Sequence, residues 1–254
     1  MLIQPNKTKA KLKQGLPAYG VISTSDDPQL AELFGIAGFD YYMLDAEHGL
    51  IDPAQAVNVI RACERTNITP LVRIGPKDPK LVLQYLDAGM MGVMMPGLES
   101  AAEVQMLVDA IKYFPGGKRG LGISRASGYT AYSGTDAPKY IDSSNEQTMV
   151  IIQFEDAKLF DNFPAMCSVP GLDACIIGPR DLSLNMGFPD GPNHPEVQTV
   201  IDKAIAIMKE KNIVSGITTG TRADAAKQVA RGVNMILASS QSVILSASKA
   251  FLPE

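Results

Sequence analysis

The segment from Tyr41 to Asp52 reads "YYMLDAEHGLID" and places Asp45, Glu47 and His48 directly after an apolar run. His48 is one of only two histidines in the chain. A histidine titrates near neutral pH, so a histidine set among acids is suited to moving a proton. The stretch therefore predicts an acid–base centre at the end of a strand. A histidine packed in the core is the alternative, and the neighbouring acids argue against it.

Other ionisable residues also follow apolar runs. Arg73 lies near the end of "TPLVRIG", Glu155 ends "TMVIIQFE" two residues after Gln153, and "GPRDLS" carries Asp181. Burying several ions at one end of a core is costly unless they are paired or bind a cation. Carboxylates are ligands that Mg²⁺ and Mn²⁺ prefer. Glu155 and Asp181 are therefore candidate ligands of one divalent cation, and a purely structural ionic network is the alternative.

Eight short apolar or β-branched runs alternate with longer amphipathic segments, which is typical of a parallel sheet with crossover helices. The expected strands are residues 18–24, 40–46, 69–75, 92–97, 148–155, 173–179, 214–220 and 233–239. Asp27, Asp52 and Asp78 each precede a proline, which is a helix-start signal. Eight such units in 254 residues favour a single (β/α)₈ TIM barrel over residues 1–254 rather than an open sheet. Such a barrel gathers the candidate residues at the carboxyl ends of its strands.

Composition excludes several classes of protein. The net charge of −4 and the absence of a long Lys/Arg cluster argue against duplex nucleic acid as a partner. The amino-terminal segment lacks the apolar core of a secretory signal, and no apolar run is long enough for a membrane helix. Cys63, Cys167 and Cys175 are odd in number and widely spaced, which predicts buried free thiols. We therefore expect a cytoplasmic protein without nucleic-acid or membrane partners.

Motifs for other chemistries are missing. No lysine falls inside an expected strand, which argues against a Schiff-base mechanism, and no G-x-S-x-G motif marks a serine hydrolase. No G-x-G-x-x-G follows the first strand, and "TTGTRAD" offers too little glycine for a phosphate loop. A dinucleotide and a phosphosugar are thus disfavoured as ligands.

Two further segments have structural predictions of their own. Residues 118–145 are rich in Gly, Ser and Tyr and are longer than a usual loop, which predicts a lid or a subunit contact. Residues 240–252 form an apolar closing helix that packs either on its own barrel or on a neighbour's.

Taken together, these motifs resemble those of the HpcH/HpaI family of metal-dependent pyruvate aldolases. The resemblance covers nearly the whole chain and rests on "LDAEHGLID", "PLVRIG", "LQYLDAGMMGVMMPGLES", "GLGISRAS", "IIQFED", "DACIIGPRDLSLNMG" and "HPEV". It implies a barrel of the phosphoenolpyruvate/pyruvate-domain type that uses a divalent cation (Mg, Mn or Co). The implied reaction is reversible aldol cleavage of a 4-hydroxy-2-oxo acid to pyruvate, or a related keto acid, and an aldehyde. The family's habit also implies a homohexamer whose closing helix is exchanged between subunits.

The resemblance assigns roles to the residues that could carry the chemistry. Glu155 and Asp181 correspond to the two metal ligands. His48 corresponds to the acid–base residue, with Asp45 as its partner and Glu47 near the waters of the metal. On this basis the proton is moved in the second strand's loop, whereas the cation is held by the fifth and sixth strands.

Substrate-binding positions follow from the same motifs. Arg73 is expected at the carbonyl side of the keto acid, and Arg125 at the aldehyde or its acid tail. The other implied substrate-binding residues are Gln153, Gly178, Pro179 and Arg180. The chain departs from the family at Arg180, where a small or neutral residue is usual, and at Gly128, which replaces an arginine. These departures leave the metal ligands and the base in place and leave the aldehyde open.

Two other functions stay open on sequence alone. One is another enolate-handling barrel enzyme, such as an oxaloacetate decarboxylase or an acyl-CoA lyase. The other is a barrel that binds a keto acid without turning it over, against which the complete set of Glu155, Asp181, His48 and Arg73 argues.

Overall fold

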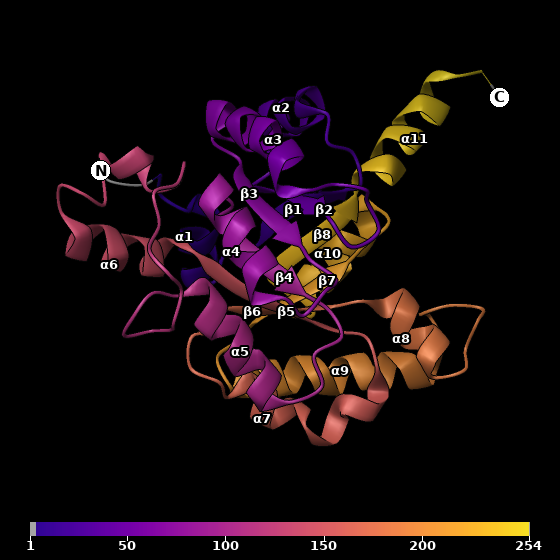
Figure 1. The fold of residues 1–254 in the computed structure, drawn as a ribbon. Helices are drawn as coiled ribbons and strands as arrows, with labels where there is room; N and C mark the ends of the chain where they lie inside the picture. Colours follow the sequence, from indigo (N-terminus) through magenta and orange to yellow (C-terminus); the bar gives the residue numbers. More distant parts are fainter. Residues whose placement is uncertain (1–3, 254) are drawn as a thin grey trace.

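The computed structural model describes residues 4–253, in which eight parallel strands pair in chain order and close into a barrel (Figure 1). The strands are β1 (Ala18–Ser23), β2 (Tyr41–Asp45), β3 (Thr69–Arg73), β4 (Gly92–Met95), β5 (Met149–Phe154), β6 (Ala174–Ile177), β7 (Val214–Thr218) and β8 (Met235–Ser239). Each lies inside one of the runs expected from the sequence, so the predicted (β/α)₈ barrel is confirmed. Most strand residues are buried because one face fills the barrel and the other packs under the helices.

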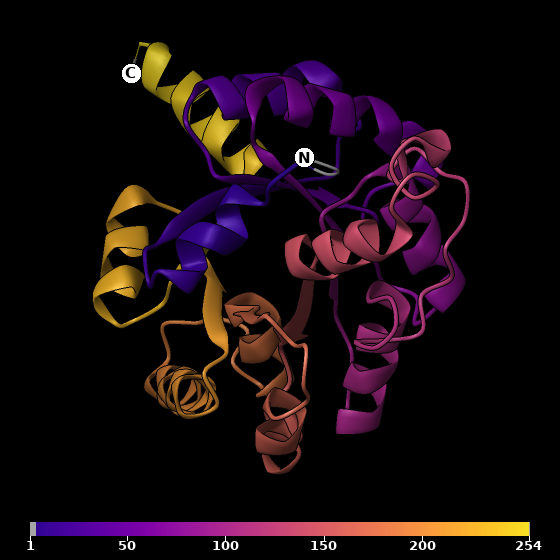
Figure 2. The same cartoon turned by 90° about the vertical axis from the view of Figure 1, so that its left-hand side faces the viewer.

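Helices surround the barrel (Figure 2). The longer ones are α2 (Pro28–Ile36), α3 (Pro53–Thr66), α4 (Pro79–Ala88), α5 (Ala101–Ile111), α6 (Ala137–Gln147), α9 (Pro195–Glu210), α10 (Arg222–Ala230) and α11 (Ser240–Phe251). The shorter ones are α1 (Lys7–Lys13), η1 (Gly128–Thr130), η2 (Ala157–Asp161), α7 (Phe163–Cys167) and α8 (Pro179–Asn185). The side chains of Asp27, Asp52 and Asp78 each accept a backbone N–H in the first turn of α2, α3 and α4, as the Asp-Pro pairs predict.

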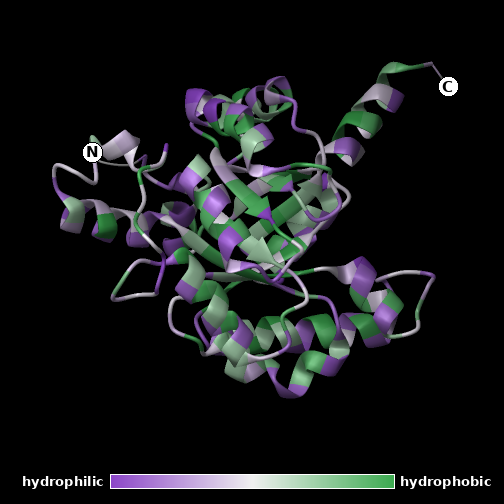
Figure 3. Cartoon of the chain, in the orientation of Figure 1, coloured by the Kyte–Doolittle hydropathy of each residue, from purple (hydrophilic) through white to green (hydrophobic). Residues whose placement is uncertain are grey.

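Two apolar clusters make the core. The smaller one fills the barrel and includes Tyr41, Met43, Leu71, Ile151, Ile176 and Leu237. The larger one lies between the strands and the helices, and Figure 3 shows mostly apolar strands at the centre, surrounded by helices that carry both polar and apolar residues. The three cysteines belong to this outer cluster as buried free thiols. A rigid, filled barrel of this kind fixes the strand ends on which a site is built.

The amino ends of the strands are covered by α1. Leu12 of α1 packs on the inner cluster, and the Thr8 hydroxyl lies 2.8 Å from the hydroxyl of Thr69 at the start of β3. This end of the barrel is therefore closed by the chain itself (Figure 2).

The segment 118–145 is not one long loop, contrary to the sequence interpretation. It contains η1 and most of α6, and the Asp136 side chain accepts the Lys139 backbone N–H at 3.1 Å, which starts α6. The local reason is the "DAP" triplet, which combines a capping aspartate with a proline in the first turn. Both pieces lie on the amino-end side of the barrel (Figure 1).

The closing helix α11 projects away from the barrel (Figure 1). Leu245 is 56% exposed and Phe251 is 90% exposed, so these two apolar side chains are not buried within this chain. Within residues 4–253, no helix combines the length and the hydropathy that crossing a membrane requires.

Candidate active site

The carboxyl ends of the strands bring most of the predicted residues together. A cavity of about 140 Å³ opens at this end of the barrel. It is lined by Ile22, Arg73, Met94, Gln153, Ile176, Gly178, Arg180, Asp181, Thr218 and Leu237. Five of these residues were predicted from the sequence. The other five were not assigned a role: Ile22, Met94, Ile176, Thr218 and Leu237. All lie on strands, and a position near the carboxyl end of a strand is the signal that finds such residues in a barrel.

Asp45 and Arg73 form a two-pronged ion pair beside the cavity. They are register partners at the ends of β2 and β3, and Arg73 Nε and Nη2 donate to Asp45 Oδ1 and Oδ2 at 2.9 and 2.6 Å. Burial alone lowers the pKa of Arg73, but the hydrogen bond and charge of Asp45, followed by Glu47, raise it overall. Arg73 is therefore a fixed cation at the cavity wall, suited to a carboxylate or a carbonyl oxygen.

His48 is exposed and does not line the cavity, but Oε2 of its neighbour Glu47 lies 3.2 Å from Arg73 Nε. The His48 side chain is 68% exposed, and its Nε2 is 3.9 Å from Glu47 Oε2. Asp45 was expected to hold the imidazole, but its carboxylate holds Arg73 instead, and Oδ1 accepts the backbone N–H groups of Glu47 and His48 at 3.2 and 3.3 Å. The reason is the β2–β3 register, which sets Asp45 opposite Arg73. Asp45 thus fixes the backbone of the His48 turn, and the acid near the imidazole is Glu47.

The acids on the β5 and β6 side repel one another. The pKa of Glu155 is raised by its burial and then by the charges of Asp181 and Glu47, against the opposing effects of Gln153 and Arg73. Gln153 Nε2 donates to Glu155 Oε2. Gly178 permits this crowding, because a Cβ there would lie 3.1 Å from Gln153 Nε2 and 3.5 Å from Glu155 Cβ. A cation is the group that would relieve the repulsion between these carboxylates.

The donor set fits a hard divalent cation with few protein ligands. Within residues 4–253 there is no cluster of three or more His, Cys, Asp or Glu that could hold an ion, so the site would rest on Glu155 and Asp181. Mg²⁺ and Mn²⁺ accept one or two carboxylates and leave other positions to water or substrate. In the same part of the chain, the buried Gln153 Oε1 has no hydrogen-bond partner, which leaves an acceptor for a bound donor.

Pro179 and Arg180 form the start of α8, the helix that carries Asp181. Pro179 is buried at the first helical position, whereas Arg180 is exposed and its Nη1 donates to the carbonyl of Pro189 at 3.2 Å. Pro179 therefore holds the turn in place, and Arg180 reaches along the rim of the cavity to the loop after α8.

Arg125 is the one predicted residue that the structure places elsewhere. Its guanidinium pairs with Glu64, with Nη1 at 3.0 Å from Oε1, and donates to the carbonyl of Ala88 at 3.2 Å. Ala88 and Glu64 lie at the ends of α4 and α3, which return to the amino ends of the strands. A segment between a helix and the next strand belongs to that end of a barrel, so Arg125 does not reach the cavity of its own chain.

Comparison with known proteins agrees with this arrangement. The family model for HpcH/HpaI aldolase/citrate lyase matches residues 19–245. The chain is 35% identical over 214 residues to 4-hydroxy-2-oxo-heptane-1,7-dioate aldolase of Escherichia coli, covering 84% of this chain and 80% of that protein. It is 33% identical over 233 residues to 4-hydroxy-2-oxovalerate aldolase of Rhodococcus jostii, covering 89% and 86%.

A solved structure shares the fold. The HpcH/HpaI aldolase from Desulfitobacterium hafniense superposes with a TM-score of 0.86 at 28% identity, over 96% of this chain and 97% of that one. Three observations agree: one family model matches most of the barrel, the relatives above are named as aldolases, and this structure superposes on the chain. The chain belongs to the HpcH/HpaI aldolase/citrate lyase family.

Proposed function

We propose that this protein is a carbon–carbon lyase that catalyses reversible aldol cleavage of a 4-hydroxy-2-oxo acid to pyruvate, or a related keto acid, and an aldehyde. The observation that carries the proposal is that Asp181 and the fixed cation Arg73 line one small cavity, while the charge of Asp181 adds to that of Glu47 in raising the pKa of Glu155. The relatives named as aldolases of 4-hydroxy-2-oxo acids support the reaction class.

Glu155 and Asp181 would hold a divalent cation in this site. When bound, such a cation would polarise the carbonyl of the keto acid and stabilise negative charge that develops on its oxygen. Arg73 lines the same cavity, and its N–H groups outside the Asp45 pair are available to bind the keto acid. Because Asp45 holds the guanidinium in one orientation, the positive charge is in place before the substrate arrives.

His48 is the residue that moves the proton. In the cleavage direction it accepts the proton of the C4 hydroxyl, and the bond between C3 and C4 breaks. The aldehyde departs, and the electron pair of the broken bond stays on the keto-acid fragment, which is then an enolate. A proton returned to C3 completes pyruvate. Glu47 lies beside the imidazole, with its Oε2 3.9 Å from Nε2.

The exposed apolar side of α11 supports a homo-oligomer as the working form. Ile244, Leu245 and Phe251 are 44%, 56% and 90% exposed, which an isolated chain would leave in water. We propose that α11 packs on a neighbouring subunit and that the assembly is a hexamer. Light scattering of the whole chain and of a chain that ends before Ser240 tests this, since loss of α11 should dissociate the assembly.

Solvent exchange of pyruvate protons is the sharpest test of the reaction. The protein with Mn²⁺, Mg²⁺ or Co²⁺ in D₂O should replace the methyl protons of pyruvate with deuterium, followed by proton NMR, and EDTA should stop it. Absence of metal-dependent exchange would refute enolate formation. Exchange accompanied by oxaloacetate decarboxylation, but by no cleavage of any 4-hydroxy-2-oxo acid, would instead favour the decarboxylase alternative.

A further inference from the structure

Two arginines line the cavity at the carboxyl ends of the strands, and they differ in what their charges face. Arg73 is held by Asp45 in a two-pronged pair, and Glu47 Oε2 lies 3.2 Å from its Nε. Arg180 donates from Nη1 to the carbonyl of Pro189 at 3.2 Å, which is a neutral acceptor. Within residues 4–253, the arginines that form ion pairs are Arg73, Arg119, Arg125 and Arg231. Arg180 is therefore a cation of the cavity wall that this part of the chain leaves without a carboxylate partner.

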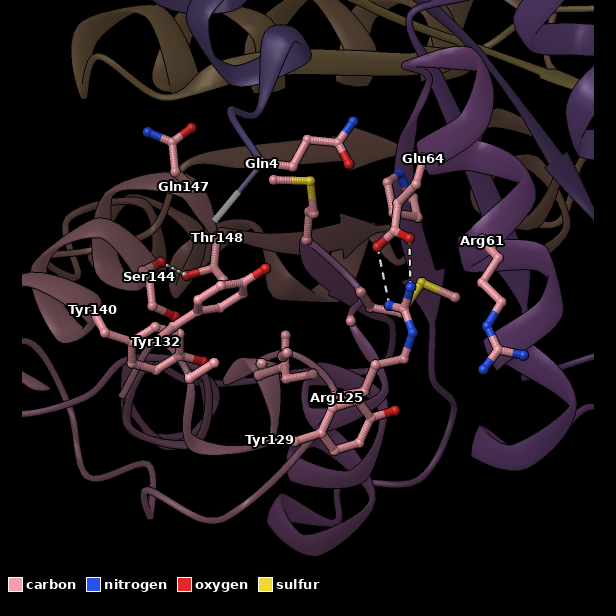
Figure 4. A pocket seen from close by; sticks show the side chains of 18 of the residues that line it. Gln4, Arg61, Glu64, Arg125, Tyr129, Tyr132, Tyr140, Ser144, Gln147 and Thr148 are labelled. Atoms are coloured by element: carbon pink, nitrogen blue, oxygen red, sulfur yellow. Dashed lines mark hydrogen bonds and ion pairs between the residues drawn. The ribbon is translucent and has the colours of Figure 1, made fainter. Parts of the chain in front are cut away.

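A larger cavity, of about 740 Å³ at the amino ends of the strands, shows the opposite situation. Figure 4 shows Arg125 of its wall facing Glu64, to which Nη1 donates at 3.0 Å. Arg119 of the same wall has its Nη2 2.8 Å from Asp87 Oδ1. These two guanidinium groups are neutralised by acids of their own chain. An arginine that is to bind an anionic ligand needs N–H donors that no such acid occupies.

The turn after α8 holds the Arg180 side chain at the rim of the cavity. The Gly191 N–H donates to the carbonyl of Phe188 at 3.2 Å, which closes a turn around Pro189. Gly191 has φ +121°, and a Cβ there would lie 3.5 Å from Arg180 Nη1. The guanidinium thus rests against this turn and is bonded to it once. Its position is fixed while its other N–H groups remain free for a ligand.

The candidate metal carboxylates do not use Arg180 as their counter-charge. Burial, followed by the charge of Asp181, raises the pKa of Glu155, and the cation that opposes this rise is Arg73. Glu155 and Asp181 would face a divalent cation once it is bound. The charge of Arg180 is then left unmatched, and it is available to an anionic group that enters with the substrate.

The cavity is too small to enclose a whole substrate. Its volume is about 140 Å³, whereas pockets that enclose a ligand usually measure about 300–1,000 Å³. With the keto-acid end beside Arg73, the part of the substrate that becomes the aldehyde extends toward the mouth. Arg180 is exposed at that mouth. Apart from Arg73, Arg180 and Asp181, the lining residues carry no charge: Ile22, Met94, Gln153, Ile176, Gly178, Thr218 and Leu237.

We propose that Arg180 binds a carboxylate at the far end of the aldehyde portion of the substrate, so that the 4-hydroxy-2-oxo acid cleaved by this chain is a diacid. The inference rests on the proposed aldol cleavage and adds to it the class of aldehyde. A carboxylate matches the planar donor set of a guanidinium group. Because Arg180 is exposed, we expect a preference of about tenfold for a charged aldehyde rather than an absolute requirement.

Aldol addition to two aldehydes of matched length tests the proposal. The full chain with Mn²⁺ and pyruvate is offered 4-oxobutanoate or its neutral methyl ester, and pyruvate consumption gives kcat/KM for each. The wild type should prefer the acid by about tenfold, and the preference should shrink as NaCl is raised from about 0.05 to 0.5 M.

The outcomes separate this inference from the proposed function. Equal kcat/KM for the acid and the ester would refute the role of Arg180 and leave aldol cleavage standing. Pyruvate proton exchange without addition to the acid would likewise refute that role. Neither proton exchange nor addition to any aldehyde would refute both proposals.

Variants assign the preference to one side chain. Arg180→Ala should lower the acid-to-ester ratio of kcat/KM by about tenfold, chiefly through KM for the acid. Arg180→Lys keeps the charge but loses the planar donor set, so it should lower the ratio by only about threefold. Lys158→Ala is the control, because Lys158 is exposed after β5 at the same end of the barrel and does not line the cavity. Its ratio should equal that of the wild type.

A purely structural role for Arg180 gives a different result. If Arg180 only ties the turn at Pro189 to α8, Arg180→Ala should lower the melting temperature and change kcat/KM for the acid and the ester by the same factor. An unchanged ratio in Arg180→Ala would therefore refute the proposal. If that variant does not fold, Arg180→Lys decides, and a wild-type ratio with a wild-type salt dependence would refute the proposal equally.

Discussion

The two ends of the barrel bury charge in opposite ways. At the amino end, Lys9 Nζ lies 2.8 Å from Asp173 Oδ1, and Lys112 Nζ lies 2.6 Å from the Thr148 carbonyl. Each of these ammonium groups has several oxygen acceptors, and Lys9 itself belongs to α1. At the carboxyl end, carboxylates crowd together strongly enough to raise the pKa of Glu155.

This difference separates structural charge from functional charge. Ions whose partners all lie within the chain have no free group with which to bind a ligand. Their effect is therefore on the free energy of unfolding. Like charges held together at an open cavity destabilise the chain unless a further group arrives, which is the condition for binding a cation. Changes at the carboxyl end should therefore alter activity and spare the fold, and changes at the amino end should do the reverse.

Removing a metal carboxylate should have the largest effect. Glu155→Ala or Asp181→Ala should lower pyruvate proton exchange and aldol cleavage by about 10³-fold or more, since residues 4–253 contain no cluster of three or more His, Cys, Asp or Glu that could hold the ion without them. In EDTA, the melting temperature of either variant should be no lower than that of the wild type, because the substitution removes one of the carboxylates that repel one another.

The control for the metal carboxylates is Asp156→Asn. Asp156 directly follows Glu155 but caps η2 by accepting the Lys158 N–H at 2.9 Å. It should keep full metal-dependent activity. If Glu155→Ala kept its activity as well, the two-carboxylate site would be wrong.

Replacing the acid–base residue comes next in size. His48→Gln should lower kcat by about 10²- to 10⁴-fold while leaving metal affinity unchanged, because His48 carries the proton and does not hold the ion. Its 68% exposure means that the melting temperature should stay the same. Calorimetric metal titration and steady-state kinetics measure the two effects separately.

The second histidine is the matched control. His194 stacks on Phe188 at 3.8 Å and accepts the Glu196 N–H at 3.3 Å as the cap of α9. His194→Gln should cost some stability and no activity. A His48→Gln protein that melts early yet turns over at the normal rate would assign His48 a structural role instead.

The sequence was sufficient for the barrel and for most of the cavity. Alternating periodicity and Asp-Pro starts place every strand, and barrel geometry then requires that Arg73, Gln153 and Asp181 meet. The sequence is enough for this step, because the apolar pattern and the strand-end positions can be recognised without knowing how any side chain is oriented.

What the sequence did not predict depends on contacts between distant elements. The partner of Asp45 is set by the register between β2 and β3, which no local pattern encodes. The position of Arg125 depends on how residues 118–136 fold back toward α3, and the start of α6 was hidden in a segment whose composition is typical of a loop. All three differences concern where a residue or helix lies, and none of them changes the chemistry expected of the strand ends.

At the amino end, Asp173→Asn should lower stability and leave chemistry intact. The change removes the negative charge facing Lys9 and Lys112 and weakens the acceptor of the Val150 N–H. Because these side chains are partly exposed, we expect a cost of about 2 kcal/mol, below the range for a fully buried pair, or roughly 6 °C in melting temperature. Asp202→Asn, which breaks the exposed pair with Arg231, should cost less than about 1 kcal/mol.

A pH dependence of the free energy of unfolding should originate at Lys112. Burial lowers the pKa of Lys112 to about 7, with Asp173 opposing the shift and Lys9 adding to it. The unfolded chain holds this proton up to the ordinary pKa near 10.5 and the folded chain releases it earlier. Stability should therefore rise as the pH increases from about 7 toward 10.

Comparison with Lys112→Met isolates this contribution from other groups that titrate in the same range. Urea unfolding at several pH values between 7 and 10 should show a slope for the wild type that the variant lacks, of up to about 1.4 kcal/mol per pH unit. The variant's overall stability does not enter, because only the slopes are compared. Equal slopes would mean that the oxygens of Thr148 and Asn145, at 2.6 and 2.8 Å from Nζ, keep the ammonium charged throughout. The amino end would then be a fully satisfied ionic cluster, and the contrast with the crowded acids at the other end of the barrel would be sharper still.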